Sequence, residues 1–525
     1  MKWALISVSD KTGIVDFSKY LQRLSYNFLA SRGSAKYLGE HGIKAIKIED
    51  YIQCEELLNG RVKTLHPYIH AGLLARDKKE DNDTLVKLNI HKIDILICNL
   101  YPFESIVKKE DAKEDDVIEN IDIGGVSLLR SAAKNYKRVL VASSFDDYKK
   151  IMDALSDTGE SDIKLREEMA GKAFSLCAHY DILISNWLKT KYQKNNKELP
   201  FDDEYISLKT HIPLRYGENP HQASFAYKNP SSFSLGILDA HLLQGTPLSY
   251  NNILDLDLAM RATLPFSYAA ATIVKHQSPI GIGEVWSEDM TYQAVRYAIK
   301  GDPVSAYGGI LAFNRCFDKA CCHEIEGLFL ECIIAPSFSE DAKVILQKRK
   351  KCRILELPFP STTKLKKTSE IRSIIGGYIF QDMDLYCEDD IKDFRCVTKR
   401  KIEKEDWNHI YFSWKAIYAL RSNAILLSSK MKECTGYYTS GIGSGQPNRV
   451  DATKDAIRRG GSDASYSILA SDAFIPFIDT LKEAMEQRIS IIVQPGGSIR
   501  DEECIAYCNE HNLAMVFTGK RHFKH

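Results

Sequence analysis

A lysine and a histidine stand side by side at the end of an apolar run, in the segment AAATIVKHQSPIGIG at 269–283. The run from Ala269 to Val274 is typical of a buried strand. A histidine titrates near neutral pH and can take up a proton, while an adjacent lysine can stabilise developing negative charge. Lys275 and His276 are therefore candidate catalytic residues, although on these residues alone a solvent-facing strand end is the favoured explanation.

Two turns near the N-terminus are rich in hydroxyl groups. Each follows an apolar run and precedes a helical pattern; they hold Ser7, Ser9, Lys11 and Thr12, and then Ser31, Gly33 and Ser34. Free N–H groups at the start of a helix, at the carboxyl end of a parallel sheet, form a natural anion site. Helix capping explains each turn taken singly. The two together fit capping and a phosphate-bearing ligand equally well.

The segment NGRVKTLHPYIHAG at 59–72 gathers basic and titratable groups. It holds Arg61, Lys63, His66 and His70 around Pro67. Arginine suits bidentate binding of phosphate, and lysine suits a point-charge role. The two histidines have i, i+4 spacing, but no third ligand lies nearby in sequence, so we predict an anion site and no zinc.

Two further segments add groups suited to proton transfer. CNLYPF at 98–103 contributes Asn99 and Tyr101, and ENIDIGGVSLLRSAAKN at 119–135 contributes Asp122, Gly124–Gly125 and Lys134. An acid, a phenol and a lysine around one sheet edge could perform acid–base chemistry. Each signal is weak by itself.

Alternating apolar strands and helical patterns fill the first 190 residues. Continuous apolar strands are expected at 3–8, 26–31, 44–48, 93–100 and 137–143, as both-face burial in a parallel sheet requires. They predict a doubly wound α/β domain. The polar stretch 189–205 predicts a linker and thus domains at 1–192 and 193–525. In the second, a strand, a Gly/Ser turn and a helix occur around Lys275 and again at 490–503, which suggests a duplication without a clean sequence repeat.

Composition restricts the class of protein. Of 525 residues, 44% are apolar and 27% charged, and 70 Lys+Arg balance 70 Asp+Glu, so neither a nucleic-acid nor a membrane partner is expected. No run approaches 18 apolar residues, and no signal peptide is recognised. The 13 cysteines form no paired C-x2-C motifs, which indicates a reducing cytoplasm and no structural zinc. GIGSGQ at 441–446 lacks the third glycine of a dinucleotide fingerprint.

Taken together, the motifs resemble those of the bifunctional purine biosynthesis enzymes. In that family, phosphoribosylaminoimidazolecarboxamide (AICAR) formyltransferase is joined to inosine monophosphate (IMP) cyclohydrolase. The motifs that carry the resemblance, over essentially the whole chain, are SVSDKTG, GRVKTLHP, CNLYPF, IDIGG, RYGENPHQ, IVKHQSP and QPGGSIRD. The resemblance implies a methylglyoxal-synthase-like N-terminal domain and a C-terminal domain of two cytidine-deaminase-like halves without the deaminase zinc.

The implied reactions use only small molecules. A formyl group passes from 10-formyltetrahydrofolate to the 5-amino group of AICAR, and formyl-AICAR then closes to IMP with loss of water. The resemblance further implies a cytoplasmic homodimer with no required metal.

The resemblance also assigns residues to each site. In the cyclohydrolase, the nucleotide-binding residues would be Ser7, Ser9, Lys11, Ser31, Gly33, Ser34, Arg61, Thr64, Asn99, Gly124 and Gly125, with Lys63, Tyr101, Asp122 and Lys134 around the reacting ring. In the formyltransferase, Lys275 and His276 would be catalytic; Arg215, Tyr216, Asn252, Gly308, Glu331, Asn423 and Arg449 would bind AICAR, and Tyr307, Pro476, Phe477 and Asp479 the folate.

The chain departs from the family pattern at four places. Arg32-Gly33-Ser34 replaces G-G-T, so Arg32 either adds charge for a phosphate or crowds the turn. Ser278-Pro279-Ile280-Gly281 replaces N-P-C-G, Glu331 stands where some members have aspartate, and the loop expected between Asn423 and Gly441 looks long.

Two other classes of protein fit the α/β pattern less well. A nicotinamide-dependent oxidoreductase is opposed by the broken glycine pattern. A regulatory nucleotide-binding protein without catalysis is opposed by the presence of Lys63, Asp122, Lys275 and His276.

Overall fold

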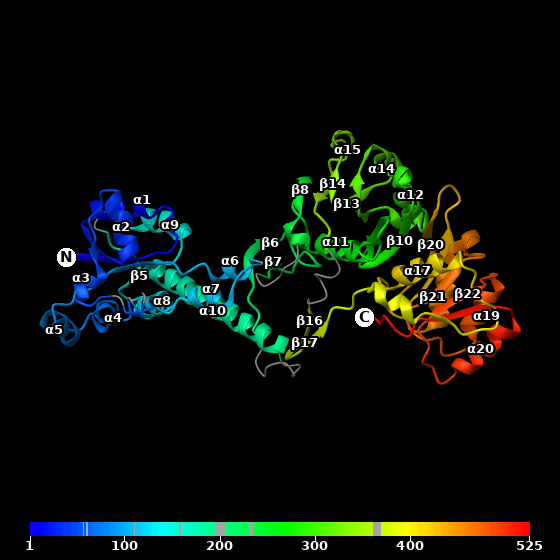
Figure 1. Ribbon diagram of the computed structural model, residues 1–525. Helices are drawn as coiled ribbons and strands as arrows, with labels where there is room; N and C mark the ends of the chain where they lie inside the picture. Colours follow the sequence, from blue (N-terminus) through cyan, green and yellow to red (C-terminus); the bar gives the residue numbers. More distant parts are fainter. Residues whose placement is uncertain are drawn as a thin grey trace. The chain divides into compact units, whose positions relative to one another are not determined.

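The computed structural model describes residues 1–525 except 56, 59–60, 63, 110, 157–158, 196–204, 230–234 and 361–368. The chain forms two compact units, Met1–Ser207 and Leu208–His525 (Figure 1). Residue 192, the expected end of the first domain, lies within helix α10 (Ile163–Asn195). The prediction of a linker is therefore wrong for 189–195, because lysine and glutamine are as favourable in an exposed helix as in a loop. Residues 196–204 of that predicted linker lie outside the described part of the chain.

A five-stranded parallel sheet forms the centre of the first unit. Its strand order is β3-β2-β1-β4-β5, with every neighbouring pair parallel. The strands are β1 (Lys2–Ser7), β2 (Tyr26–Ala30), β3 (Ile46–Lys47), β4 (Ile95–Cys98) and β5 (Leu140–Ala142). Four of them lie within the predicted runs, and β1 starts one residue before its run. The order reverses beside β1, which makes its carboxyl edge a natural place for a ligand.

Helices cover both faces of this sheet (Figure 1). One face packs on α1 (Ile14–Arg23), α2 (Arg32–Glu40) and α9 (Phe145–Ala154), and the other on α4 (Pro67–Leu74), α8 (Gly124–Lys134) and α10. Shorter helices are α3 (Ile48–Ile52), α5 (Lys79–Lys87), α6 (Phe103–Val107) and α7 (Glu114–Glu119). Residues of β1 alternate between the two cores, as strands buried on both faces require. The doubly wound prediction is confirmed.

The second unit is built on one continuous sheet of twelve strands. Its order is β18-β23-β22-β21-β19-β20-β10-β9-β11-β13-β15-β8. In chain order the strands are β8 (His241–Gln244), β9 (Ala269–Lys275), β10 (Ser278–Val285), β11 (Gly309–Phe313), β13 (Leu330–Ala335), β15 (Arg353–Glu356), β18 (Arg395–Cys396), β19 (Ile425–Lys430), β20 (Gly436–Gly443), β21 (Ile468–Ser471), β22 (Ile491–Gln494) and β23 (Ala514–Phe517).

Three small strand pairs lie outside this sheet. They are β6 (Lys209–Pro213) with β7 (Phe225–Lys228), β12 (Cys316–Phe317) with β14 (Ser337–Phe338), and β16 (Ser369–Ile374) with β17 (Gly377–Asp382).

The large sheet consists of two halves with the same topology. In each half, two strands form an antiparallel hairpin, and a third strand pairs antiparallel with the outer strand of that hairpin. Two further strands then continue the sheet in parallel, and an antiparallel strand forms its edge. The halves join through antiparallel pairing of β10 with β20. This confirms a duplication, but β19–β20, rather than the segment at 490–503, is the counterpart of the Lys275 hairpin. The residues between Asn423 and Gly441 are accordingly two strands and a turn, not a long loop.

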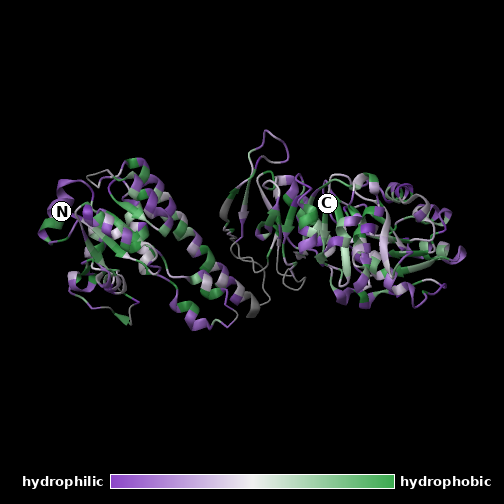
Figure 2. Ribbon diagram, turned by 90° about the horizontal axis from the view of Figure 1, so that it is seen from above, coloured by the Kyte–Doolittle hydropathy of each residue, from purple (hydrophilic) through white to green (hydrophobic). Residues whose placement is uncertain are grey.

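Helices again lie on both faces. One face packs on α11 (Tyr250–Thr263) and α17 (Asp406–Ile417), and the other on α12 (Tyr292–Lys300), α14 (Lys319–Glu324), α15 (Glu340–Leu346), α18 (Arg449–Gly460), α19 (Asp479–Glu486) and α20 (Asp501–Glu510). The short helix α13 (Pro303–Ala306) precedes β11. Within each unit, apolar residues concentrate in the strands and polar residues on the outer helices (Figure 2). None of the described helices is long and apolar enough to cross a membrane.

Candidate active sites

Three turns of the first unit meet at the carboxyl edge of its sheet. Asn99, just after β4, accepts hydrogen bonds through Oδ1 from the N–H groups of Ser9 (2.6 Å) and Asp10 (3.2 Å) and donates from Nδ2 to the Asp10 carbonyl (2.7 Å). The Asp10 carboxylate accepts bonds from the hydroxyl and the N–H of Thr12, which hold its pKa below the ordinary value. The loop after β1 is thus fixed beside β4.

The serines of the second turn are tied to the same loop. Ser34 Oγ accepts from the N–H of Val8 (3.2 Å) and from Ser31 Oγ (3.1 Å). Ser31 precedes α2, and a Cβ on Gly33 would meet no atom within 4 Å, so the first turn of the helix is open. Lys11 Nζ stays on this edge, bonded to the carbonyl groups of Val8 (3.4 Å) and Ser9 (3.3 Å). Hydroxyls, N–H groups and an ammonium therefore converge as an anion site requires.

Arg32 does not crowd this turn. It is the first residue of α2 and has no left-handed backbone angle, so glycine is not needed there. Its guanidinium forms an ion pair with Glu49 on α3. The crowding interpretation is therefore wrong, and the arginine charge is shared with a carboxylate of the same chain.

The next segment packs against the start of α8. Thr64 is buried, and a Cβ placed on Gly124 would lie 2.5 Å from Thr64 Oγ1. Asp122, two residues before α8, accepts through Oδ1 from the N–H of Gly125 (2.7 Å) and so satisfies one of the free N–H groups in the first turn of the helix. Arg61 is exposed and pairs with Glu119 on α7. Lys63, the fourth predicted residue of this region, lies outside the described residues.

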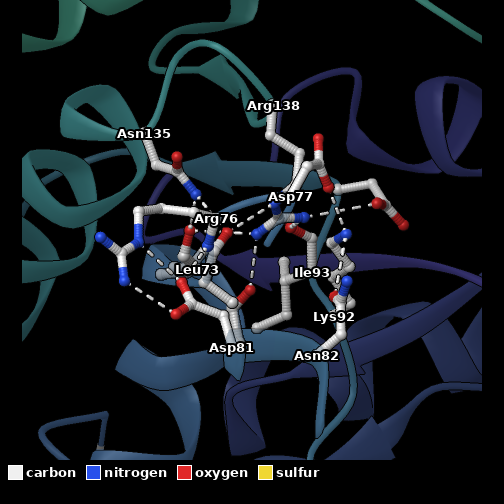
Figure 3. Close-up of polar contacts among 12 residues, drawn as sticks. Leu73, Arg76, Asp77, Asp81, Asn82, Lys92, Ile93, Asn135 and Arg138 are labelled. Carbon is white, nitrogen blue, oxygen red and sulfur yellow. Dashed lines mark hydrogen bonds and ion pairs between the residues drawn. The ribbon is translucent and has the colours of Figure 1, made fainter. Parts of the chain in front are cut away.

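Helix α4 is held firmly behind this segment. His66 caps it by accepting from the N–H of Tyr68 (3.2 Å), and His70 Nδ1 lies 2.9 Å from Ser131 Oγ on α8. Arg138 donates to the carbonyl groups of Gly72 (2.8 Å), Leu73 (3.1 Å), Ala75 (3.0 Å) and Ile93 (2.7 Å), as Figure 3 shows in part. Asn135 donates to Leu73 and Ala75 as well. The histidines thus fix α4, and α4 fixes the residues that precede it.

Tyr101 and Lys134, two residues predicted to surround the reacting ring, lie at different positions in the first unit. Tyr101 follows β4, in the loop that also holds Asn99, and is partly buried. Lys134 is the exposed last residue of α8, whose eleven residues span about 15 Å. Sequence spacing alone did not reveal that Lys134 lies at the opposite end of the helix from Gly124.

In the second unit, Lys275 and His276 form the tip of the β9–β10 hairpin. His276 and Gln277 are the two turn residues, and both have left-handed backbone angles, with φ of 52° and 57°. Lys275 Nζ donates to the carbonyl of Tyr307 (2.7 Å), beside Gly308 with φ of 78°. His276 itself is exposed. The pair therefore lies at an accessible strand end whose lysine is fixed.

A cleft of about 380 Å³ opens at this turn. It is lined by Lys275, His276, Ser278, Pro279, Ile280, Ser305, Ile442, Gly443, Ser444, Gln446, Asp455 and Arg459. The residues from 442 onward belong to GIGSGQ and α18 in the other half of the sheet. They arrive because β10 and β20 are neighbours. The sequence alone does not place GIGSGQ opposite the lysine–histidine pair, because the pairing of β10 with β20 joins strands far apart in the chain.

Some of the predicted AICAR-binding residues in the first half of the large sheet contact one another. Asn252, buried at the start of α11, donates from Nδ2 to Glu331 on β13 (2.8 Å). The exposed Arg215 lies over the ring of Tyr216, 5.3 Å from its centroid. Their segment approaches α11 through Asn251, which donates to the Glu218 carbonyl (3.5 Å).

The predicted residues of the second half form a buried polar cluster. Arg449 is 7% exposed and donates to Asp472 (2.6 Å), Ser471 (2.7 Å) and Asn423 (3.0 Å). Asp472 also accepts from the N–H of Ala424 (3.1 Å). The guanidinium is thus already bonded to three side chains of its own chain, which gives it a structural role beside any contact with substrate.

The predicted folate residues present an exposed aromatic surface. Phe477 is 49% exposed in the loop after β21, and the guanidinium of Arg500 lies 4.7 Å from its ring centroid. Pro476 is partly buried beside it, and Asp479 starts α19. Tyr307, the predicted folate residue in the first half of the large sheet, is 60% exposed. Flat apolar side chains of this kind suit a planar ring system.

Comparisons with known proteins identify the family of this chain. The family model described as the MGS-like domain matches residues 13–127, and that described as the AICARFT/IMPCHase bienzyme matches residues 132–459. Three relatives are named bifunctional purine biosynthesis protein PurH. The chain is 41% identical to that of Caldicellulosiruptor saccharolyticus over 100% of both chains, 42% identical to that of Prochlorococcus marinus strain NATL1A over 99% of both, and 41% identical to that of Ligilactobacillus salivarius over 100% of both. The chain therefore belongs to the AICARFT/IMPCHase bienzyme family and is a bifunctional enzyme of the last two steps of IMP synthesis, an AICAR formyltransferase and IMP cyclohydrolase.

Proposed function

We propose that the formyl transfer occurs in the cleft at the β9–β10 turn, in the unit Leu208–His525. The supporting observation is that His276, the one histidine lining the described cleft, stands next to Lys275 and faces polar groups of the other half of the sheet. The formyltransferase activity implies a formyl-folate co-substrate, and we take it to be 10-formyltetrahydrofolate. The exposed rings of Tyr307 and Phe477 are suited to its flat pterin.

The transfer needs a base because an aromatic amine conjugated to a carboxamide is a weak nucleophile. The 5-amino nitrogen attacks the formyl carbon while His276 accepts a proton from that nitrogen. Negative charge develops on the formyl oxygen and is stabilised by the Lys275 ammonium. The bond from the formyl carbon to the folate nitrogen then breaks, and that nitrogen takes up a proton.

We assign the cyclisation to the carboxyl edge of the sheet in Met1–Ser207. Ser7, Ser9, Lys11, Ser31, Gly33, Ser34, Arg61, Thr64, Asn99, Gly124 and Gly125 are proposed to hold the nucleotide, chiefly through its phosphate. Tyr101 and Asp122 border the same edge, where they can move protons as the carboxamide nitrogen attacks the formyl carbon and water leaves. Lys63 and Lys134 remain predictions of the resemblance.

The remaining AICAR contacts are proposed for Arg215, Tyr216, Asn252, Gly308, Glu331, Asn423 and Arg449, and a folate contact for Pro476 and Asp479. We further propose a homodimer that works in the cytoplasm. All thirteen cysteines lie among the described residues and are free thiols, which fits a reducing compartment.

One comparison tests the assignment. Wild-type enzyme and His276→Ala are each given AICAR with 10-formyltetrahydrofolate, and separately formyl-AICAR alone, and products are identified by absorbance and mass. We expect His276→Ala to lose formyl transfer at least a hundredfold and to cyclise supplied formyl-AICAR at the wild-type rate. Equal loss of both reactions, or full formyl transfer by the variant, would contradict the assignment. Wild-type binding of AICAR without any product would favour a regulatory nucleotide-binding protein.

A further inference from the structure

The turn that carries His276 has an unusual backbone. Its two central residues, His276 and Gln277, both have positive φ, at 52° and 57°. Two-residue hairpins of type I′ require this geometry, and their sequences are commonly Asn-Gly or Gly-Gly, because a side chain disfavours positive φ and glycine has none. Neither residue here is a glycine or an asparagine. Something outside the turn must therefore hold it in this conformation.

Asp255 on α11 supplies that support. Its Oδ2 accepts from the N–H of His276 (3.0 Å), and its Oδ1 accepts from the N–H (2.7 Å) and the Nε2 (2.9 Å) of Gln277. A carboxylate makes stronger hydrogen bonds than a neutral acceptor. All three donors belong to the two left-handed residues, so one side chain fixes the whole turn.

The neighbouring lysine is fixed separately. Lys275 Nζ is bonded to the carbonyl of Tyr307, on the segment before β11. The His276 ring is exposed. Its position follows from its backbone, and its backbone follows from Asp255.

The second half of the sheet shows that the fold can form the corresponding hairpin without a carboxylate bonded to the backbone of its turn. The corresponding hairpin, β19–β20, connects through the five residues 431–435, and none of them has a positive φ. There the aspartate of the packed helix, Asp406 on α17, bonds to the side chain of Lys430 (3.0 Å) instead of to turn backbone. The tight, carboxylate-held turn is thus specific to the half that carries the lysine–histidine pair.

We propose that Asp255 is a positioning residue for formyl transfer, which holds the His276–Gln277 turn in its left-handed conformation and so sets the histidine against the cleft. This inference rests on the proposed role of His276. It predicts that replacing Gln277 by glycine, which adopts positive φ without help, makes the carboxylate less necessary.

The test uses full-length enzyme with Asp255→Ala, Gln277→Gly and the double variant. Formyl transfer is measured as kcat and KM for AICAR, urea unfolding reports on the fold of the second unit, and cyclisation of formyl-AICAR, which we assign to the first unit, is the internal control. We expect Asp255→Ala to lower kcat about tenfold or more with little change in KM and none in cyclisation. Gln277→Gly alone is expected to stay within about twofold of wild type, and the double variant to regain most of the lost kcat with an unchanged pH profile.

Asp257→Asn is the matched control, since Asp257 lies two positions further along α11, on a different side of the helix from Asp255, and bonds to Arg261 (2.7 Å) instead of the turn. Its kcat should equal that of wild type. The proposal is overturned if Asp255→Ala keeps full kcat. It is also overturned if Gln277→Gly fails to restore a folded Asp255→Ala enzyme, because Asp255 would then act on the ring or substrate itself. His276→Ala is measured in the same assay. If that variant keeps full formyl transfer, the proposed function of His276 itself has failed, and none of the outcomes above predicts this result.

Discussion

Thr64 Oγ1 occupies the space that a side chain on Gly124 would need, 2.5 Å from the place of its Cβ. The threonine is buried and follows the Arg61–Lys63 segment, while the glycine starts α8. The close approach holds Thr64 against the start of α8, next to Gly125, whose N–H donates to Asp122 Oδ1. A steric relationship between two small residues therefore sets the spacing of the proposed nucleotide-binding groups.

Gly124→Ala should impair cyclisation selectively. The added methyl would force Thr64 or the start of α8 to move, and overpacking of this kind typically costs about 1–3 kcal/mol. If that cost falls on binding of the transition state, kcat/KM for formyl-AICAR drops about tenfold or more. Formyl transfer should not change, since we propose that it takes place in the other unit. The measurement is steady-state cyclisation of supplied formyl-AICAR.

Gly171→Ala on α10 is the control for a methyl group added to a helix, because a Cβ there would meet nothing within 4 Å. Cyclisation by that variant should match wild type. Wild-type cyclisation by Gly124→Ala would show that the Thr64 contact does not position the site.

Arg449→Met should destabilise the second unit. The substitution leaves Asp472 buried without its cation, and breaking a buried ion pair from one side costs roughly 3–5 kcal/mol. Arg458→Met on the same helix removes an exposed pair with Asp455 and should cost about 1 kcal/mol or less. Urea unfolding of both variants and of wild type gives the comparison. Equal stability of the two variants, with weaker AICAR binding by Arg449→Met alone, would mean that Arg449 acts through the substrate.

The fold of the first unit was largely readable from sequence. Its four strands other than β3 are largely apolar and buried, and burial on both faces leaves few other structures for such runs. What spacing could not supply is distance across the sheet. Asn99 meets Ser9 because β4 lies beside β1, and Lys134 is carried away from Gly124 because α8 is continuous to its end.

The sequence did not reveal which segments of the second unit correspond in the duplication, and the reason is physical. Its clearest sequence signal is a pair of glycines, Gly281 and Gly283, repeated as Gly441 and Gly443. A Cβ on any of the four would lie 2.6 Å or less from a carbonyl oxygen of the helix behind, at Ala298, Ala294, Ala456 and Ala452. The glycines thus recur because each strand must pack closely on the helix behind it. Small residues of this kind also suit a turn. Read as turns, these glycines conceal the strands β10 and β20 and with them the cleft that joins the two halves.

Below neutral pH, the buried His409 should weaken the second unit. Its ring stacks on Tyr437 with centroids 4.6 Å apart, Nε2 lies 2.9 Å from Ser428 Oγ, and burial, aided by the charge of Lys430, lowers its pKa from 6.5 to about 3. The unfolded chain therefore takes up a proton below about pH 6.5 while the folded chain does not. The free energy of unfolding then falls with falling pH, by up to about 1.4 kcal/mol per pH unit, so this residue contributes about 2 kcal/mol of loss between pH 7 and pH 5. Urea unfolding of wild type and of His409→Gln, which has no titratable group there, should show curves that differ in slope over this range. Parallel curves would show that the imidazole becomes protonated without unfolding of its surroundings.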